Sequence, residues 1–172
     1  DEAAYREHLR RLAQCCAGSG QVERAIELLL EARAPREAGD LLARHAVDLW
    51  RAGRVRQLAT LARQILQADE AGSGWVHFWE GMALSSHDEP ASRRAFDAAR
   101  LCFQSEANRK GEVLAAACAT EATLGLWDSF EGLEERFALI EHAHADIIAL
   151  EDPSLRLLAM AGFLDGAGHL AR

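Results

Sequence analysis

The sequence has few of the residues that interrupt helices or build strands. Only three prolines and one tyrosine occur among 172 residues. β-branched residues are scarce and never alternate with polar ones over the length of a strand. A sheet-based core is therefore excluded, because strands are built largely from β-branched and aromatic residues. Ala, Leu, Glu and Arg dominate instead, and these residues lose little conformational entropy in a helix. The composition predicts an all-α protein.

Long hydrophobic runs and paired-cysteine motifs are missing as well. No run of about 18 apolar residues indicates a membrane span, and no signal peptide is visible. Four cysteines occur, at positions 15, 16, 102 and 118, and no CxxC spacing exists among them. We therefore expect reduced thiols in a cytoplasmic protein that makes no membrane contact.

The chain also lacks an excess of positive charge. Its formal net charge is −8, which argues against nucleic-acid contact, because phosphate binding requires a surplus of Lys and Arg. Residues 1–66 carry 11 basic and 9 acidic side chains (net +2), and residues 67–172 carry 8 and 18 (net −10). The acidic half indicates either a basic partner or a solvated surface that keeps the protein dissolved.

Apolar residues recur at helical spacing almost throughout the chain. Nine stripes follow from this spacing, at residues 5–16, 22–30, 38–49, 55–66, 75–83, 91–102, 113–124, 130–140 and 153–170. We expect Tyr5 and Leu12 to be buried in the first stripe and Phe130 in the eighth. Asp128 is a suitable N-cap for the eighth helix, and the seventh is expected to end near Gly125. All three prolines fall at expected helix starts.

The spacing of the turns predicts how these helices are organised. Turns within helical hairpins are expected near Gly20, Gly53, Pro90 and Asp128, which are 33, 37 and 38 residues apart. Such a period is typical of stacked helix-turn-helix units. We predict a single all-α domain over residues 1–172, a TPR-like α-solenoid of antiparallel helix hairpins with about nine helices. The start at Asp1 suggests a fragment of a larger multidomain protein.

The last expected helix, at residues 153–170, has almost no polar face. A helix that is apolar all round requires cover on both sides. We therefore expect a homodimer in which two copies meet through this helix.

No pattern in the sequence indicates catalysis, a cofactor or a metal site. Gly18-Ser19-Gly20 and Gly72-Ser73-Gly74 lack the Gly-Lys-Ser/Thr that completes a phosphate-binding loop. His142 and His144 would point about 200° apart on one helix, so the two rings could not share a metal ion. No serine, histidine or aspartate sits in a recognisable catalytic setting.

Four side chains are candidates for contacting a ligand in a groove along the first helices of the hairpins: His45, His77, Glu80 and Glu121. The alternative for the two histidines is helix packing or plain surface exposure. Glu121 lies near a buried stripe, where a carboxylate needs a partner or its pKa rises. Its alternative role is a salt bridge to a neighbouring helix. Four tryptophans, at positions 50, 75, 79 and 127, suit either a binding platform or the core.

Two stretches resemble one bacterial family. The first includes Leu9, Gly20-Gln21-Val22-Glu23-Arg24-Ala25-Ile26-Glu27, Ala38-Gly39-Asp40-Leu41-Leu42 and Arg51 to Gly53; the second runs from Trp79-Glu80-Gly81-Met82-Ala83-Leu84 through Ala95, Ala98, Ala99, Phe103, Asn108 and Gly111. They are similar to the helical repeats of MalT-like, LuxR-type ATP-dependent (STAND) transcriptional regulators. Leu58 and Leu133 depart from the TPR pattern, which prefers Ala at these positions.

The resemblance implies a sensor and assembly segment of a signal-responsive regulator that binds a small-molecule effector or a regulatory protein. In that family, ATP and DNA are bound by other modules, an NTPase and a helix-turn-helix, whose motifs this chain lacks. Two alternatives stay open: a free-standing TPR-like adaptor for proteins, and a helical subdomain that completes an enzyme's active site.

Overall fold

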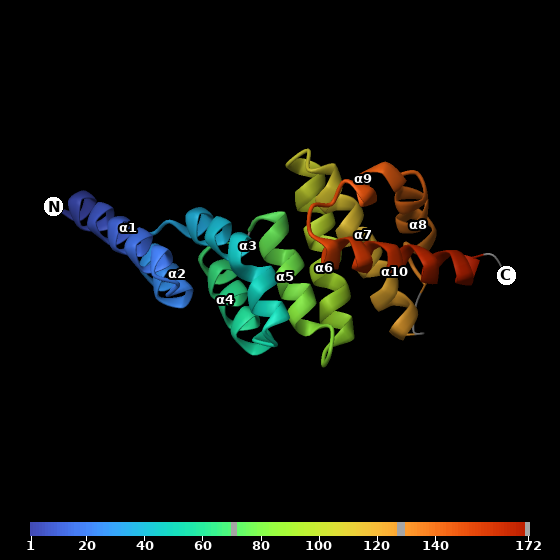
Figure 1. The fold of residues 1–172 in the computed structure, drawn as a ribbon, viewed down its shortest axis with the longest axis horizontal. Coiled ribbons are helices and arrows are strands. Elements are labelled where there is room, and N and C mark those ends of the chain that lie inside the picture. The colour runs from blue at the N-terminus through green and yellow to red at the C-terminus, as the bar shows by residue number, and fades with distance from the viewer. Residues whose placement is uncertain (70–71, 127–129, 171–172) are drawn as a thin grey trace. The chain divides into compact units, whose positions relative to one another are not determined.

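The computed structural model describes residues 1–69, 72–126 and 130–170, and these residues form ten helices and no strand. The helices are α1 (Glu2–Gly18), α2 (Val22–Glu31), α3 (Pro35–Arg51), α4 (Val55–Ala68), α5 (Gly74–Leu84), α6 (Glu89–Ser105), α7 (Arg109–Leu126), α8 (Leu133–Glu141), α9 (His144–Ile148) and α10 (Pro153–Leu170) (Figure 1). The all-α prediction is confirmed, and the helix beyond the expected nine is the short α9.

The chain divides into two compact units, Asp1–Glu80 and Gly81–Arg172, with the boundary inside α5. The single repeat domain over residues 1–172 stays a prediction, and each unit is described by itself below.

A proline marks the starts of α3, α6 and α10, and an aspartate also caps α6 and α10. The carboxylate of Asp88 accepts a hydrogen bond from the backbone N–H of Ala91 at 3.1 Å, which caps α6. Asp152 accepts from the N–H of Ser154 at 2.8 Å at the start of α10. Pro35, Pro90 and Pro153 all lie in the first turn of a helix, as expected, because a missing N–H there costs no intrahelical hydrogen bond.

The two turns that close the first hairpins share one geometry. Gly20 and Gly53 adopt left-handed φ angles of 79° and 70°, a region that glycine enters without a steric penalty. After Gly20, the N–H of Gln21 bonds the carbonyl of Cys16; after Gly53, the N–H of Arg54 bonds the carbonyl of Leu49, each at 2.9 Å. This is the Schellman pattern that ends a helix and reverses the chain, so both predicted turns are confirmed.

The first unit is built from successive hairpins packed against each other. Helix α2 packs against α1, α3 and α4. The backbone of Gly39 on α3 approaches Val76 of α5 closely, because a Cβ at position 39 would lie 3.1 Å from the valine methyl. Trp79 is fully buried and its ring lies 6.4 Å from that of Trp50. The aromatic stripe of α5 is therefore part of the core.

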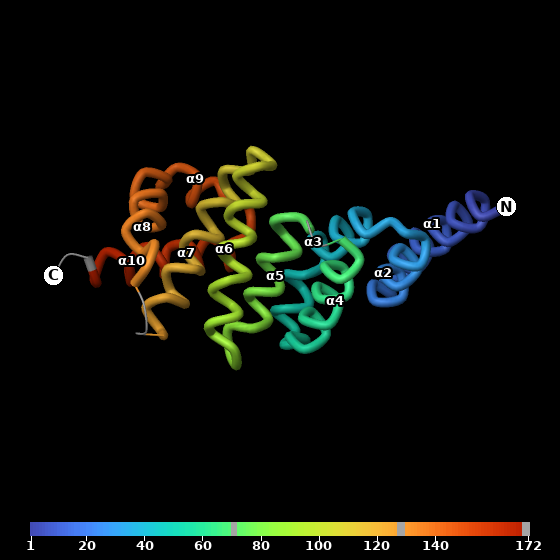
Figure 2. Tube along the Cα trace, turned by 180° about the vertical axis from the view of Figure 1, so that it is seen from behind, coloured from blue at the N-terminus to red at the C-terminus, as the bar shows by residue number. Residues whose placement is uncertain are grey.

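The second unit is organised around α7. Every residue from 111 to 120 is buried, and α6, α8, α9 and α10 all pack on this helix. Figures 1 and 2 show α10 running across α7 and α8 and not alongside them as a hairpin partner. The crossing is close, because a Cβ at Gly162 would overlap the carbonyl oxygen of Ala117.

Several local expectations differ from the structure. Tyr5 and Leu12 are 54% and 41% exposed, although the hydroxyl of Tyr5 donates a hydrogen bond to Oε1 of Glu31 on α2 at 2.6 Å. Phe130 lies before α8 and is 42% exposed. As expected, α7 ends near Gly125, with Leu126 as its last residue. Asp128, expected as N-cap and hairpin turn, lies outside the described residues, and Gly132 precedes α8 instead.

Candidate functional site

An open groove of about 630 Å³ lies in the first unit. It is formed where the start of α2, the last turns of α3 and the start of α4 meet. Its lining residues are Gly20, Gln21, Val22, Glu23, Arg24, Glu27, His45, Asp48, Leu49, Ala52, Arg54 and Gln57. The two Schellman turns therefore position the groove, since they end α1 and α3 and bring the next helix starts to the same place.

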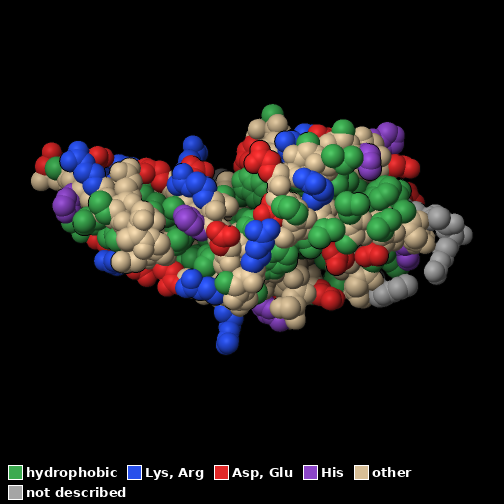
Figure 3. Space-filling view, viewed as in Figure 1, with side chains coloured by type: hydrophobic (Ala, Val, Ile, Leu, Met, Phe, Trp, Pro, Cys, Tyr) green, Lys and Arg blue, Asp and Glu red, His purple; other side chains and the backbone are tan. Residues whose placement is uncertain are grey.

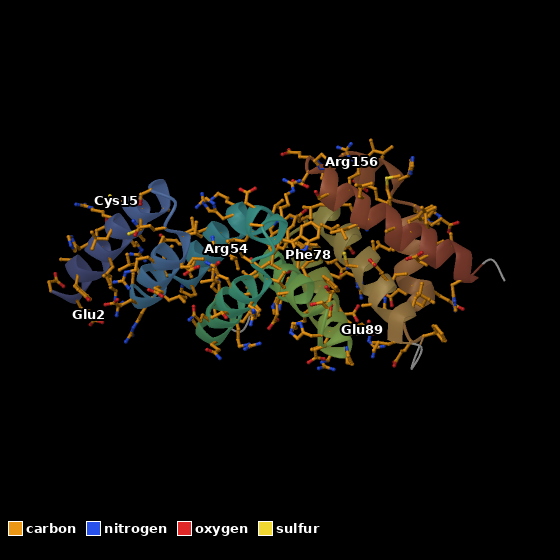
Figure 4. All side chains as sticks on the ribbon, turned by 60° about the horizontal axis from the view of Figure 1, so that its bottom comes forward. Glu2, Cys15, Arg54, Phe78, Glu89 and Arg156 are labelled. Atoms are coloured by element: carbon orange, nitrogen blue, oxygen red, sulfur yellow. The ribbon has the colours of Figure 1, made fainter. Side chains whose placement is uncertain are left out.

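Two exposed ion pairs border this groove. Nη2 of Arg54 lies 3.0 Å from Oε1 of Glu23, which connects the start of α4 to the first turn of α2. Arg54 is labelled in Figure 4. Nη1 of Arg24 lies 2.9 Å from Oε2 of Glu27 within α2. All four side chains are more than half exposed, and ion pairs in such positions contribute only about 0–1 kcal/mol each.

Two other polar side chains in the groove have no such partner. Within the described part of the chain, the side chains of His45 and Asp48 make no hydrogen bond or ion pair. They lie three residues apart on α3, so they are neighbours on one face of the helix. His45 is half-buried and Asp48 is exposed. The half-buried side chain of Val22 and the small exposed part of Leu49 add apolar surface to the groove.

The four candidate residues from the sequence are not brought together. His45 lines the groove. His77 and Glu80 are half-buried on α5, and His77 lies against the loop before it, where a Cβ at Gly72 would be 2.9 Å from its Nε2. Glu121 lies on α7 in the second unit and is exposed. The groove therefore includes one of the four.

Glu121 is distinguished by its electrostatic surroundings. Desolvation raises the pKa of its carboxyl, although part of the side chain remains exposed, and the nearby negative charge of Asp165 on α10 raises the pKa further. Neither of the two roles considered for this residue, a ligand contact or a salt bridge, is needed to explain the shift: desolvation and like charge both disfavour the ionised form.

The sequence did not single out Asp48, Glu23 or Arg54. A signal was present, because all three lie within five residues of a turn glycine, Gly20 or Gly53. Residues near two successive turns of a hairpin stack come close together in space. Sequence spacing cannot tell which of them remain without a partner, and that is what the structure adds.

The remaining histidines and the cysteines singled out in the sequence lie outside the groove. His142 follows the end of α8, and its Nδ1 lies 2.9 Å from the carbonyl oxygen of Ala138. His144 begins α9. The two histidines therefore do not lie on one helix, contrary to the expectation from the sequence. The four cysteines are free, and Cys118 is buried in α7. Trp127 lies outside the described residues.

In the three described ranges, no helix combines the length and apolar character that crossing a bilayer requires.

Comparison with known proteins gives no relative: no protein-family model, curated protein or solved structure matches this chain significantly.

Proposed function

We propose that this chain is a non-catalytic segment of a bacterial signal-responsive transcriptional regulator, which binds an effector or regulatory protein in the cytoplasm. The observation that carries the proposal is the groove between successive hairpins, with the uncommitted side chains of His45 and Asp48 on one face of α3. The resemblance of the hairpin sequences to MalT-like regulators supports the same role.

The mechanism follows from which elements line the groove. Its walls come from α2, α3 and α4, so a ligand that contacts all three favours one packing of the first hairpin on the second. A ligand can shift such an equilibrium only by its difference in affinity between the two packings. We propose that this difference is passed to neighbouring modules as the regulatory signal.

Blocking the groove tests this function without assuming the ligand's chemistry. Ala52 lines the groove and is exposed at the end of α3, so Ala52→Trp fills it at little risk to the core. Ala68 ends α4, is also exposed and does not line the groove, so Ala68→Trp is the matched control. In a transcription reporter with the intact regulator, Ala52→Trp should abolish the response to signal and Ala68→Trp should not. An unchanged response in Ala52→Trp contradicts the proposal, as does an intact gene with no NTPase module.

The oligomerisation part of the proposal concerns α10. One side of this helix packs on α7, α8 and α9, while Leu157, Met160 and Leu164 on the other side are 67%, 44% and 63% exposed. Figure 3 shows hydrophobic side chains gathered over this region. Leu157 and Leu164 lie symmetrically about the midpoint of this exposed stripe of α10. An antiparallel two-fold contact therefore places Leu157 of one copy opposite Leu164 of the other. We propose a second copy of the chain as the partner of this face.

A further inference from the structure

The groove in the first unit has hydrogen-bonding groups of two kinds that the protein itself does not use. Its free acceptor is the carboxylate of Asp48, with the His45 ring beside it. Its free donors are backbone N–H groups, because no side chain caps the start of α2 or of α4, and the first N–H groups of a helix have no intrahelical partner. A ligand that binds both kinds of group must therefore carry acceptors for the N–H groups and a donor or a cation for the carboxylate.

The shape of the groove favours an extended segment of protein over a small molecule. Small-molecule sites are concave, mostly apolar and enclose most of the ligand. Here most lining residues are exposed, and Leu49 is the only buried one. A peptide segment supplies carbonyl oxygens for the helix-start N–H groups and can place an apolar side chain on Leu49.

The charges of the groove favour a basic segment. The lining carries three carboxylates, from Glu23, Glu27 and Asp48, and two guanidinium groups, from Arg24 and Arg54. Each guanidinium is already paired with a glutamate, at 2.9 and 3.0 Å. Asp48 is therefore the lining charge for which the described residues supply no counterion. The Arg54–Glu23 pair is exposed and weak, so an incoming cation can also compete for Glu23 at little cost.

We propose that this groove binds a basic segment of a partner protein, with a Lys or Arg side chain paired to Asp48 and an adjacent apolar side chain on Leu49. The segment's carbonyl oxygens accept from the starts of α2 and α4. This inference rests on the proposed function, of which it specifies the ligand chemistry.

A pair of synthetic peptides tests the ligand chemistry on the whole chain. The probes are acetyl-Ala-Leu-Ala-Arg-Ala-amide and the same peptide with Glu in place of Arg, titrated at millimolar concentration while backbone amide NMR signals are recorded. We expect the Arg peptide to shift the signals of residues 20–27 and 45–57 and the Glu peptide to leave them unchanged. Asp48→Asn should weaken the binding of the Arg peptide about fivefold, which is the upper range for the loss of one exposed ion pair.

The control is Asp40→Asn, an exposed carboxylate on the same helix that does not line this groove; it should bind like the unaltered protein. Equal binding of both peptides, unaltered binding by Asp48→Asn, shifts confined to other residues, or no binding each overturn the inference. None of these results bears on the proposed function, because Ala52→Trp blocks the groove whatever ligand it holds.

Discussion

Nη1 of Arg136 on α8 lies 3.1 Å from Oδ1 and 3.3 Å from Oδ2 of Asp97 on α6, with the arginine almost completely buried. Nη2 of the same guanidinium donates to Oγ1 of Thr123 on α7 at 2.7 Å and to the carbonyl of Glu131 at 3.0 Å. One side chain therefore ties α6, α7 and α8 together in the second unit.

Removing the partner of this buried cation should destabilise the protein. Asp97→Asn is expected to lower the free energy of unfolding by about 2 kcal/mol, less than for a fully buried pair because the aspartate is one-third exposed. Urea denaturation followed by circular dichroism measures the change. Glu135→Ala, which removes an exposed partner of Arg100 at 3.4 Å, should cost under about 0.5 kcal/mol. An equal decrease in the free energy of unfolding for Asp97→Asn and Glu135→Ala contradicts the role assigned to Arg136.

The close crossing of α10 and α7 predicts opposite effects at two glycines of one helix. Gly162→Ala is expected to destabilise by about 2 kcal/mol, because the new methyl group would overlap the carbonyl of Ala117. A Cβ added at Gly168 would have no heavy atom within 4 Å. Gly168→Ala should therefore raise the free energy of unfolding by about 0.5 kcal/mol, because alanine has the higher helix propensity. Thermal unfolding of the two variants side by side gives both values. A neutral Gly162→Ala would show that the helices do not approach so closely.

The cysteines should differ sharply in reactivity. Burial raises the pKa of the Cys118 thiol, and the negative charge of Glu121 raises it further, so almost no thiolate forms at this position near neutral pH. Cys15 is exposed. Iodoacetamide labelling followed by peptide mass spectrometry should modify Cys15 early and Cys118 only after denaturation. Labelling of both at similar rates in the folded protein would contradict the buried position of α7.

Glu121 predicts a pH dependence of stability. Burial and Asp165 raise the pKa of its carboxyl in the folded state, so the folded protein binds this proton more tightly than the unfolded chain does. The stabilisation is complete below the unfolded pKa and is lost as pH rises through the folded pKa. Glu121→Gln should therefore raise the melting temperature at pH 7 and change it little near pH 4.

Asp165→Asn relieves the same repulsion and should act in the same direction at pH 7. If Glu121→Gln instead lowers the melting temperature at pH 7, the carboxylate has a favourable partner, which was the alternative role considered from the sequence.

The exposed stripe of α10 predicts self-association. Leu157→Glu combined with Leu164→Glu should convert a dimer into a monomer in light scattering, because charges would be buried at the contact. Leu101→Glu is the control, since Leu101 is 55% exposed on α6 of the same unit and should leave the mass unchanged. A monomeric unaltered protein at high concentration contradicts the self-association.

Local chemistry was sufficient to place most of the helices from sequence. Pro35, Pro90 and Pro153 could be assigned to helix starts because a helix tolerates their missing N–H only in its first turn. Gly20 and Gly53 could be assigned to turns because glycine enters the left-handed region without a steric penalty. The turn after α2 uses Arg33 at φ 55° and that after α6 uses Ala107 at φ 54°. Neither residue carries a turn signal. The end of the helix before Arg33 was marked by the following Ala34-Pro35, and the end before Ala107 only by the apolar periodicity.

The sequence by itself determined the helical class, because composition and periodicity act within a few residues. Only the tertiary structure decided which apolar stripes are covered: Leu155 and Ala159 of α10 are buried, but Leu157 and Leu164 are not. It also decided that Glu23 has a partner while Asp48 has none among residues 1–69, 72–126 and 130–170. Both outcomes depend on which helices lie side by side, and contacts between residues far apart in the chain are not encoded by spacing along it.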